Sequence, residues 1–247
     1  MTTPIDHIVL LVHDLAAATA TFQAAGFSVL TRKDATQKGG ASYRFVCFAD
    51  GSYLLLTAFT PEGAASHRLG PILAETEGPG DWSLTVPSVD KASAFGAAAG
   101  VTLGTTHDVA NDVEDGHWAL RLLLTGIGAG GDDALPFLIE DVQGRNLRIP
   151  AAVPHANGAT GIAELTVAAA DPEGSARRVA ALAGLPQPLG ARLTVTPGQS
   201  LRFVPLDPQG LGTARTGGCT GIRLSGVTAP LAGIEGSALR VTAGVPA

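Results

Sequence analysis

The first 30 residues of this chain change from one hydrophobic period to another, and this change constrains the fold more than any other feature. An apolar run of strand length begins at Asp6-His7. Asp14 then provides a helix N-cap, an alanine-rich segment follows, and Gly26 ends it before a second extended stretch at residues 27–29. We therefore expect a compact β-α-β unit at the start of the chain.

The same order of strand, helix cap and terminating glycine recurs twice. A strand predicted at residues 82–86 precedes the cap Ser88 and a helix over residues 90–99. A strand predicted at residues 162–167 precedes the cap Asp171 and a helix that reaches Leu182. The copies begin roughly 75 to 80 residues apart, which is the spacing of whole modules and not of a short solenoid repeat.

Further strand candidates follow the first two helices as hairpins. The first copy has strands at residues 42–48 and 53–58, and the second has strands at 117–124 and 135–139. Each of these copies therefore has the order β-α-β-β-β, whereas the third copy, after its first strand and helix, has short strands at 221–224 and 239–241 and lacks a second full helix. These patterns predict an α+β fold with modules over residues 1–60, 61–150 and 151–247, the third of them reduced.

Composition limits the classes of partner. A hydrophobic content of 45% supplies a core, and no apolar run is long enough to cross a membrane. The formal charge of −6, with dispersed Lys and Arg, and an aromatic content of 5% argue against nucleic-acid or anionic-membrane binding. We expect a cytoplasmic protein with a small-molecule partner, and we expect Cys47 and Cys219 to be buried core residues without a disulfide.

Four stretches resemble the vicinal-oxygen-chelate superfamily, which includes glyoxalases, bleomycin-resistance proteins and extradiol dioxygenases. They are similar to its glyoxalase-like branch, common in bacterial proteins, and lie at Asp6-His7 and at residues 51–54, 135–140 and 154–159. The resemblance implies tandem β-α-β-β-β modules whose curved sheets form a cup. We expect the third module to pack beside the cup or to pair with its twin in a homodimer.

The resemblance further implies metal ligands on the first and last strands of the paired modules. His7 stands on the first strand of module one, and aligning Ser88 with Asp14 places Asp81 at the matching position of module two. Glu140 ends the last strand of module two. One imidazole and two carboxylates would suit Fe, Mn, Ni or Zn, with Glu140 also transferring a proton.

Two departures and two alternatives accompany this metal site. Leu55 stands where relatives often have a glutamate, and Ser42 where they often have a histidine. A one-residue slip of the second strand would place Trp82 in the cleft instead of Asp81. Asp141 replaces Glu140 if the strand ends earlier.

Other polar residues are candidates for substrate binding: Ser42, Arg44, Tyr53, His117 and Arg121. We assign no role to His67 and His107, and we expect His13 to lie at the surface. For His155, in the linker at residues 154–158, we expect a structural role in positioning the third module.

The sequence and its family resemblance support two hypotheses about function, which belong to different classes of protein. One is a divalent-metal-dependent enzyme, of isomerase, lyase or dioxygenase type, acting on a small oxygenated metabolite. The other is a metal-free protein that binds or sequesters a small molecule, as bleomycin-resistance proteins do. The second predicts a more apolar cleft, lined by Phe45 or Phe48 together with Tyr53 and Leu55.

Overall fold

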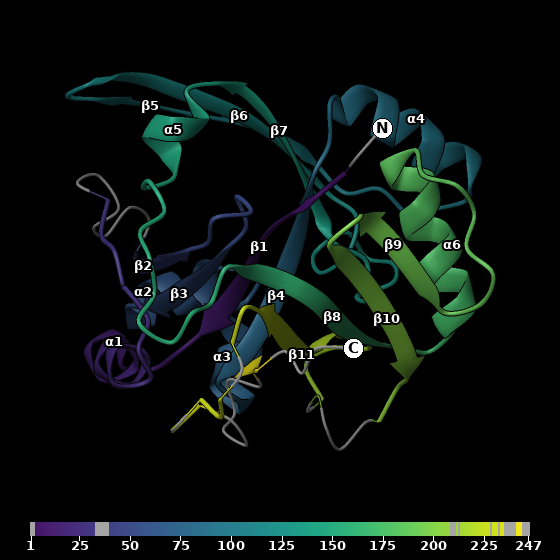
Figure 1. Ribbon diagram of the computed structural model, residues 1–247. Helices are drawn as coiled ribbons and strands as arrows, with labels where there is room; N and C mark the ends of the chain where they lie inside the picture. Colours follow the sequence, from purple (N-terminus) through teal and green to yellow (C-terminus); the bar gives the residue numbers. More distant parts are fainter. Residues whose placement is uncertain are drawn as a thin grey trace.

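The first two modules form one curled sheet. The structure, a computed structural model, describes residues 3–32, 40–207, 211, 213–227, 229–231, 233–234 and 241–243. In this part of the chain, seven strands are arranged in the order β2-β3-β1-β4-β7-β6-β5 (Figure 1). They are β1 (Ile5–Leu11), β2 (Ala41–Cys47), β3 (Tyr53–Phe59), β4 (Gly78–Thr85), β5 (Thr106–Val113), β6 (Gly116–Leu124) and β7 (Phe137–Gln143).

The two modules are built alike and meet at their first strands. In module one β1 pairs in parallel with β3, and in module two β4 pairs in parallel with β7. The first strands β1 and β4 pair antiparallel with each other and join the modules. The expected tandem arrangement within an α+β fold is thus present. The extended stretch expected at residues 27–29 is reduced to one bridge between Leu30 and Phe45.

Helices follow the first strands where the caps predict them. Helix α1 (Leu15–Ala24) is capped by Asp14, which accepts hydrogen bonds from the backbone N–H groups of two residues in the first turn. Ser88 caps α4 (Val89–Ala98) in the same way. These hydrogen bonds satisfy amide groups that the first helical turn leaves without partners.

Between the modules the chain forms two short helices that the periodicity did not predict, α2 (Pro61–Ser66) and α3 (Gly70–Glu75). Each has a proline in its first turn. The helices approach so closely that a Cβ atom at Gly70 would lie 1.8 Å from the carbonyl oxygen of Ala64. A glycine is required at this crossing because any side chain would collide with the backbone.

The third module contributes a second sheet. In the described residues its order is β12-β11-β8-β10-β9. The strand β8 pairs in parallel with β10 and antiparallel with β11, which repeats the pairing of β1 with β3 and β4. Its elements are β8 (Gly161–Ala169), α6 (Pro172–Ala183), β9 (Arg192–Thr196), β10 (Gln199–Pro205), β11 (Gly218–Ser225) and β12 (Val241–Thr242). Residues 239 and 240 of the last expected strand lie outside the described residues.

The main core lies between the two sheets. Trp82 and Phe22 are fully buried there, together with residues of β8 and α6 such as Leu165 and Val179. Figure 1 shows α4 and α6 side by side next to this core. A second apolar cluster, which includes Val9 and the α3 residues, lies on the opposite, inner face of the first sheet.

Cys47 and Cys219 are both buried, and neither forms a disulfide. Among the described residues no helix is long and apolar enough to cross a membrane.

Candidate functional site

The inner face of the seven-stranded sheet encloses a cavity of about 270 Å³. Its walls are mainly apolar and aromatic, and they come from both modules and from the α2–α3 segment. Such a volume suits a small molecule. The lining residues are His7, Val9, Arg32, Tyr43, Phe45, Tyr53, Leu55, Thr57, Phe59, His67, Arg68, Leu69, Val109, Trp118, Leu120, Leu122, Phe137, Ile139 and Arg148.

His7 lies on β1 in the wall of this cavity, and its surroundings hold its ring in place. Its Nδ1 atom lies 2.7 Å from Asp6 Oδ2 and 2.9 Å from the Ser83 hydroxyl. Its ring stacks on Tyr53, with 4.6 Å between centroids and 11° between planes. A carboxylate only accepts hydrogen bonds, so Nδ1 carries a proton, and in the neutral imidazole Nε2 then holds the lone pair. No described residue hydrogen bonds Nε2, which leaves that atom for a molecule in the cavity.

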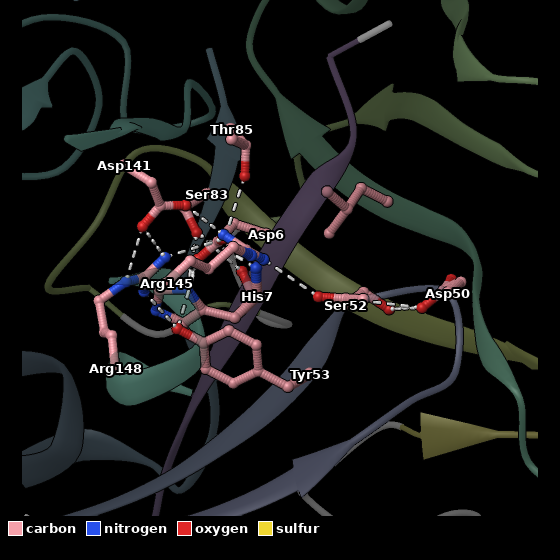
Figure 2. Close-up of polar contacts among 12 residues, drawn as sticks. Asp6, His7, Asp50, Ser52, Tyr53, Ser83, Thr85, Asp141, Arg145 and Arg148 are labelled. Carbon is pink, nitrogen blue, oxygen red and sulfur yellow. Dashed lines mark hydrogen bonds and ion pairs between the residues drawn. The ribbon is translucent and has the colours of Figure 1, made fainter. Parts of the chain in front are cut away.

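Asp6 and His7 are adjacent in a strand, where successive side chains normally point to opposite faces. The register of β1 against β4 shifts between Ile5 and Ile8, as in a β-bulge. This irregularity allows both side chains to meet on one side of the sheet, and Figure 2 shows them next to each other. The pairing of Asp6 with His7 therefore depends on a local break in strand geometry.

Asp6 is fully buried within a network of charged groups (Figure 2). Arg145 donates to its Oδ1 atom at 2.5 Å, and Arg148 lies 3.4 Å from the same oxygen. Burial alone would raise the pKa of Asp6, but the hydrogen bond from His7 and the charges of the two arginines hold it well below its usual range. Asp6 is therefore an ionised, fixed partner of His7.

The network continues to Asp141 and Tyr53. Asp141 accepts from Arg145 at 2.5 Å and from Nε of Arg148 at 2.9 Å. Arg148 also donates to the Tyr53 hydroxyl at 3.0 Å, and that hydroxyl donates to Asp6 at 3.3 Å. Both arginines come from the one-turn helix α5 (Arg145–Arg148), which directly follows β7. This helix thus fixes the group on which the His7 ring stacks.

A second ion pair lies beside the cavity. Arg68 Nη2 is 2.6 Å from Asp81 Oδ2, and Asp81 is fully buried. Burial raises the pKa of Asp81, although Arg68 and the backbone N–H of Trp82 oppose this effect. The Arg68 guanidinium lies over the Phe137 ring at 5.4 Å, and the edge of that ring also contacts His7 at 5.3 Å. A cation and the imidazole therefore flank one aromatic ring of the cavity.

Two further polar side chains reach the cavity from outside the sheet. Arg32 lies over the rings of Trp118 at 5.1 Å and Phe45 at 5.5 Å. His67 packs on Phe59, and its Nδ1 accepts from the Leu69 amide at 3.1 Å. Burial, with the charge of Arg68, lowers the pKa of His67. His67 is therefore neutral near pH 7 and presents Nε2–H.

The three expected metal ligands do not come together. Glu140 faces away from the cavity, where it accepts from the backbone N–H of Val89 and caps α4. Asp81 lies on the inner face but is paired with Arg68. In the part of the chain that the structure describes, no three His, Cys, Asp or Glu residues are placed to hold a metal ion. Leu55, Phe137 and Ile139 fill the inner positions of the last strands, so the residues present do not fit a divalent-metal centre.

Strand register explains this outcome and places four of the substrate-binding candidates away from the cavity. In β2 the residues facing the cavity are Tyr43 and Phe45, so Ser42 and Arg44 point to the opposite side. In β6 the inner residues are Trp118, Leu120 and Leu122. His117 pairs instead with Asp112, and Arg121 forms a two-bond ion pair with Asp90 of α4. Of the candidates for substrate binding, the structure places Tyr53 in the cavity wall.

Sequence reasoning missed the polar residues Arg32, His67, Arg68 and Arg148. All four lie outside the predicted strands. One signal was available: Arg148 follows the last strand of module two within a short stretch that also holds Asp141 and Arg145. Such i, i+3 and i+4 spacing brings charged side chains to one side of a helical turn.

The fold and the cavity define a class of protein in which two joined β-α-β-β-β modules enclose a small-molecule-sized space. Comparison with family profiles agrees, because the glyoxalase-like domain profile matches residues 5–183. The chain belongs to this glyoxalase-like family, within the vicinal-oxygen-chelate superfamily. No protein of curated function gives a match to the sequence.

Comparison with solved structures found similar proteins. A hypothetical protein from Staphylococcus aureus is 12% identical, with 93% of this chain and 94% of that chain covered and a TM-score of 0.59. Methylmalonyl-CoA epimerase of Streptomyces coelicolor, solved in complex with 2-nitronate-propionyl-CoA, is 25% identical over 58% of this chain and 100% of that chain, with a TM-score of 0.42.

Proposed function

We propose that the cup binds a small, largely apolar molecule that carries a carbonyl or acidic oxygen, and that His7 exchanges a proton with it without a metal ion. The observation that carries the proposal is the environment of His7. Asp6 fixes its Nδ1 proton, Tyr53 fixes its ring plane, and Nε2 remains for the cavity. A general base needs this combination of a fixed tautomer and an unshared lone pair next to its substrate.

The rest of the cavity supplies what such a reaction needs. Aromatic and aliphatic walls exclude water, which strengthens electrostatic interactions inside. Arg68 places a guanidinium over the Phe137 ring, which also contacts His7. When Nε2 removes a proton from a C–H group next to a carbonyl, the carbonyl oxygen gains negative charge, and the Arg68 guanidinium stabilises that charge. Return of the proton from His7 completes the cycle with no net consumption of either group.

The chemistry proposed here differs from the metal-dependent enzyme expected from the family resemblance. That enzyme needs His7, Asp81 and Glu140 around one ion, and Glu140 caps α4 instead. We expect protein purified without an affinity tag to carry no stoichiometric Fe, Mn, Ni or Zn by mass spectrometry, before and after incubation with these ions. Stoichiometric metal that His7→Ala loses would overturn the metal-free mechanism.

Hydrogen–deuterium exchange tests proton transfer directly. Small enolisable carbonyl compounds are first screened for binding by thermal shift, and binders are then followed in D2O by proton NMR. We expect exchange of the C–H next to the carbonyl, unaffected by a chelator. His7→Gln should retain binding and lose exchange by about 100-fold or more, the usual contribution of a general base. The exposed variant His117→Gln serves as the control and should exchange at the wild-type rate.

A second function has its own support. Phe45, Tyr53 and Leu55 line the cavity, which is the apolar lining that a metal-free sequestering protein requires. In that case the wild-type protein binds members of the screen and releases them unchanged, with no exchange at any pH. Tight binding without exchange would therefore replace the catalytic proposal with a binding function.

A further inference from the structure

The second sheet carries a cluster of arginines on the face that points away from the core. Glu164 on β8 lies among Arg192 of β9, Arg202 of β10 and Arg223 of β11. Arg192 forms a direct ion pair with Glu164, and the other two lie at 3.7 and 4.0 Å from its carboxylate. The Glu164 side chain is only 10% exposed, whereas those of the arginines are 60%, 52% and 37% exposed. One buried carboxylate thus holds three accessible cations.

The charge at this face exceeds what the fold needs. Strands β8 to β12 contain three arginines and one acidic residue, within a chain whose formal charge is −6. A single cation would neutralise Glu164, and the Ser200 hydroxyl already hydrogen bonds it at 3.1 Å. Arg192 and Arg202 are moreover direct cross-strand partners. Like charges directly opposite each other in a sheet are destabilising, and such a local conflict is typical of functional positions.

The arginine cluster also lies at the position in the third module that is equivalent to that of His7 in the first. His7 lies seven residues before its helix cap Asp14, and Glu164 lies seven residues before the equivalent cap Asp171. His7 stands on β1, which pairs in parallel with β3 and antiparallel with β4. Glu164 stands on β8, which pairs in parallel with β10 and antiparallel with β11. Glu164 therefore occupies in the second sheet the position that His7 occupies in the first. The three arginines surround that position, which in the first sheet belongs to the cavity wall.

We propose that this face binds a small molecule bearing a phosphate or diphosphate group, held by Arg192, Arg202 and Arg223, with Glu164 orienting the three guanidinium groups. The net charge of the four side chains is +2, which favours a multiply charged anion over a monoanion. Guanidinium groups arriving from three strands suit an anion with oxygens in several directions, whereas a planar carboxylate pairs best with one arginine. The site is separate from the cup and independent of the function proposed for it.

Inorganic pyrophosphate is the probe, titrated into the full chain at low ionic strength and followed by calorimetry. We expect saturable binding at one site that NaCl of equal ionic strength does not reproduce. Arg192→Gln combined with Arg202→Gln should weaken binding by about tenfold or more, because each removes charged hydrogen bonds. Arg177→Gln, an exposed arginine of α6, is the matched control and should bind normally. His7→Gln should also bind normally, which excludes the cup as the site.

Several outcomes would overturn the site. They are a titration without saturation, an equal response to NaCl, unchanged affinity in the double variant, or citrate binding as tightly as pyrophosphate. Melting temperatures without pyrophosphate provide a second readout: because Arg192 and Arg202 repel each other, Arg202→Gln should not melt below wild type, yet should lose the stabilisation that pyrophosphate gives. If the double variant does not fold, Arg223→Gln replaces it with the same expectation of weakened binding.

Discussion

Asp6 connects folding with chemistry in this protein. Its carboxylate is the partner of His7, and the same group compensates the charges of Arg145 and Arg148 inside the first module pair. A buried charge is tolerated only where partners surround it, and here the partners come from a segment 139 and 142 residues away in the sequence. The carboxylate that orients the imidazole of His7 thus also connects distant parts of the chain through ion pairs.

Replacing Asp6 by Asn tests how much the charge of this carboxylate contributes to stability. The amide keeps the shape but removes the charge, which leaves Arg145 and the almost fully buried Arg148 to share the single carboxylate of Asp141. We expect the free energy of unfolding to fall by about 3 kcal/mol, as when one partner of a buried ion pair is lost. Urea unfolding provides the measurement, with the exposed Asp112→Asn as control. A loss of less than about 1 kcal/mol would show that the network does not depend on this charge.

At the scale of elements, strand register decides which residues reach the cavity. Strand β2 pairs with β3 so that Phe45 lies opposite Leu55 and Arg44 opposite Leu56. Cross-strand partners share a face, and Leu55 belongs to the cavity wall whereas Leu56 belongs to the core between the sheets. A shift by one residue would exchange these two sets completely.

Alanine substitutions on β2 test this register. We expect Phe45→Ala to weaken binding of a cavity ligand found in the carbonyl screen by about tenfold, because it removes an aromatic wall. Arg44→Ala, one residue away, should change the affinity by less than about twofold. Calorimetry measures both. The reverse order of effects would place Arg44, and with it Ser42, inside the cup.

At the scale of the molecule, the two sheets share one core and are joined by polar contacts. His155, in the segment between them, accepts from the Ser28 amide through Nδ1 at 3.0 Å, and its Nε2 lies 3.1 Å from the Cys47 carbonyl oxygen. Asp50 accepts from the amide of Ile162 and from Gln199 of the second sheet. His155 therefore holds the linker against module one in its neutral form. Whether a second copy of the chain also packs on the third module stays a prediction.

The neutral state of His155 predicts a pH dependence of stability. Burial lowers its pKa, although its contact with Cys47 opposes the effect. When the pKa of a histidine is lower in the folded state than in the unfolded state, the unfolded state binds the proton more tightly, so protonation favours unfolding. Its stabilising contribution is therefore complete above the unfolded pKa of about 6.5 and is lost as the pH falls below that value. We expect the free energy of unfolding to decrease from pH 7 to pH 5.

His155→Gln should make this decrease less steep, as measured by urea unfolding at several pH values. The decrease should not vanish, because His67 also has a lowered pKa and contributes in the same direction. The variant His13→Gln serves as control and should keep the wild-type slope. A wild-type slope in His155→Gln would mean that the linker histidine does not titrate with unfolding.

The sequence by itself determined the first strand and helix of each module, the modular repeat and the helix caps, and it placed His7 on the first strand. These features depend on neighbours within a few residues, such as Asp14 and the amide groups it caps. Only the tertiary structure decided which face of each strand meets the cavity, and it therefore turned Glu140, Arg44 and Arg121 away. It also brought Asp6 to Arg145 and folded α2 and α3 over the cup, because these contacts depend on register and on packing between distant segments that no local pattern encodes.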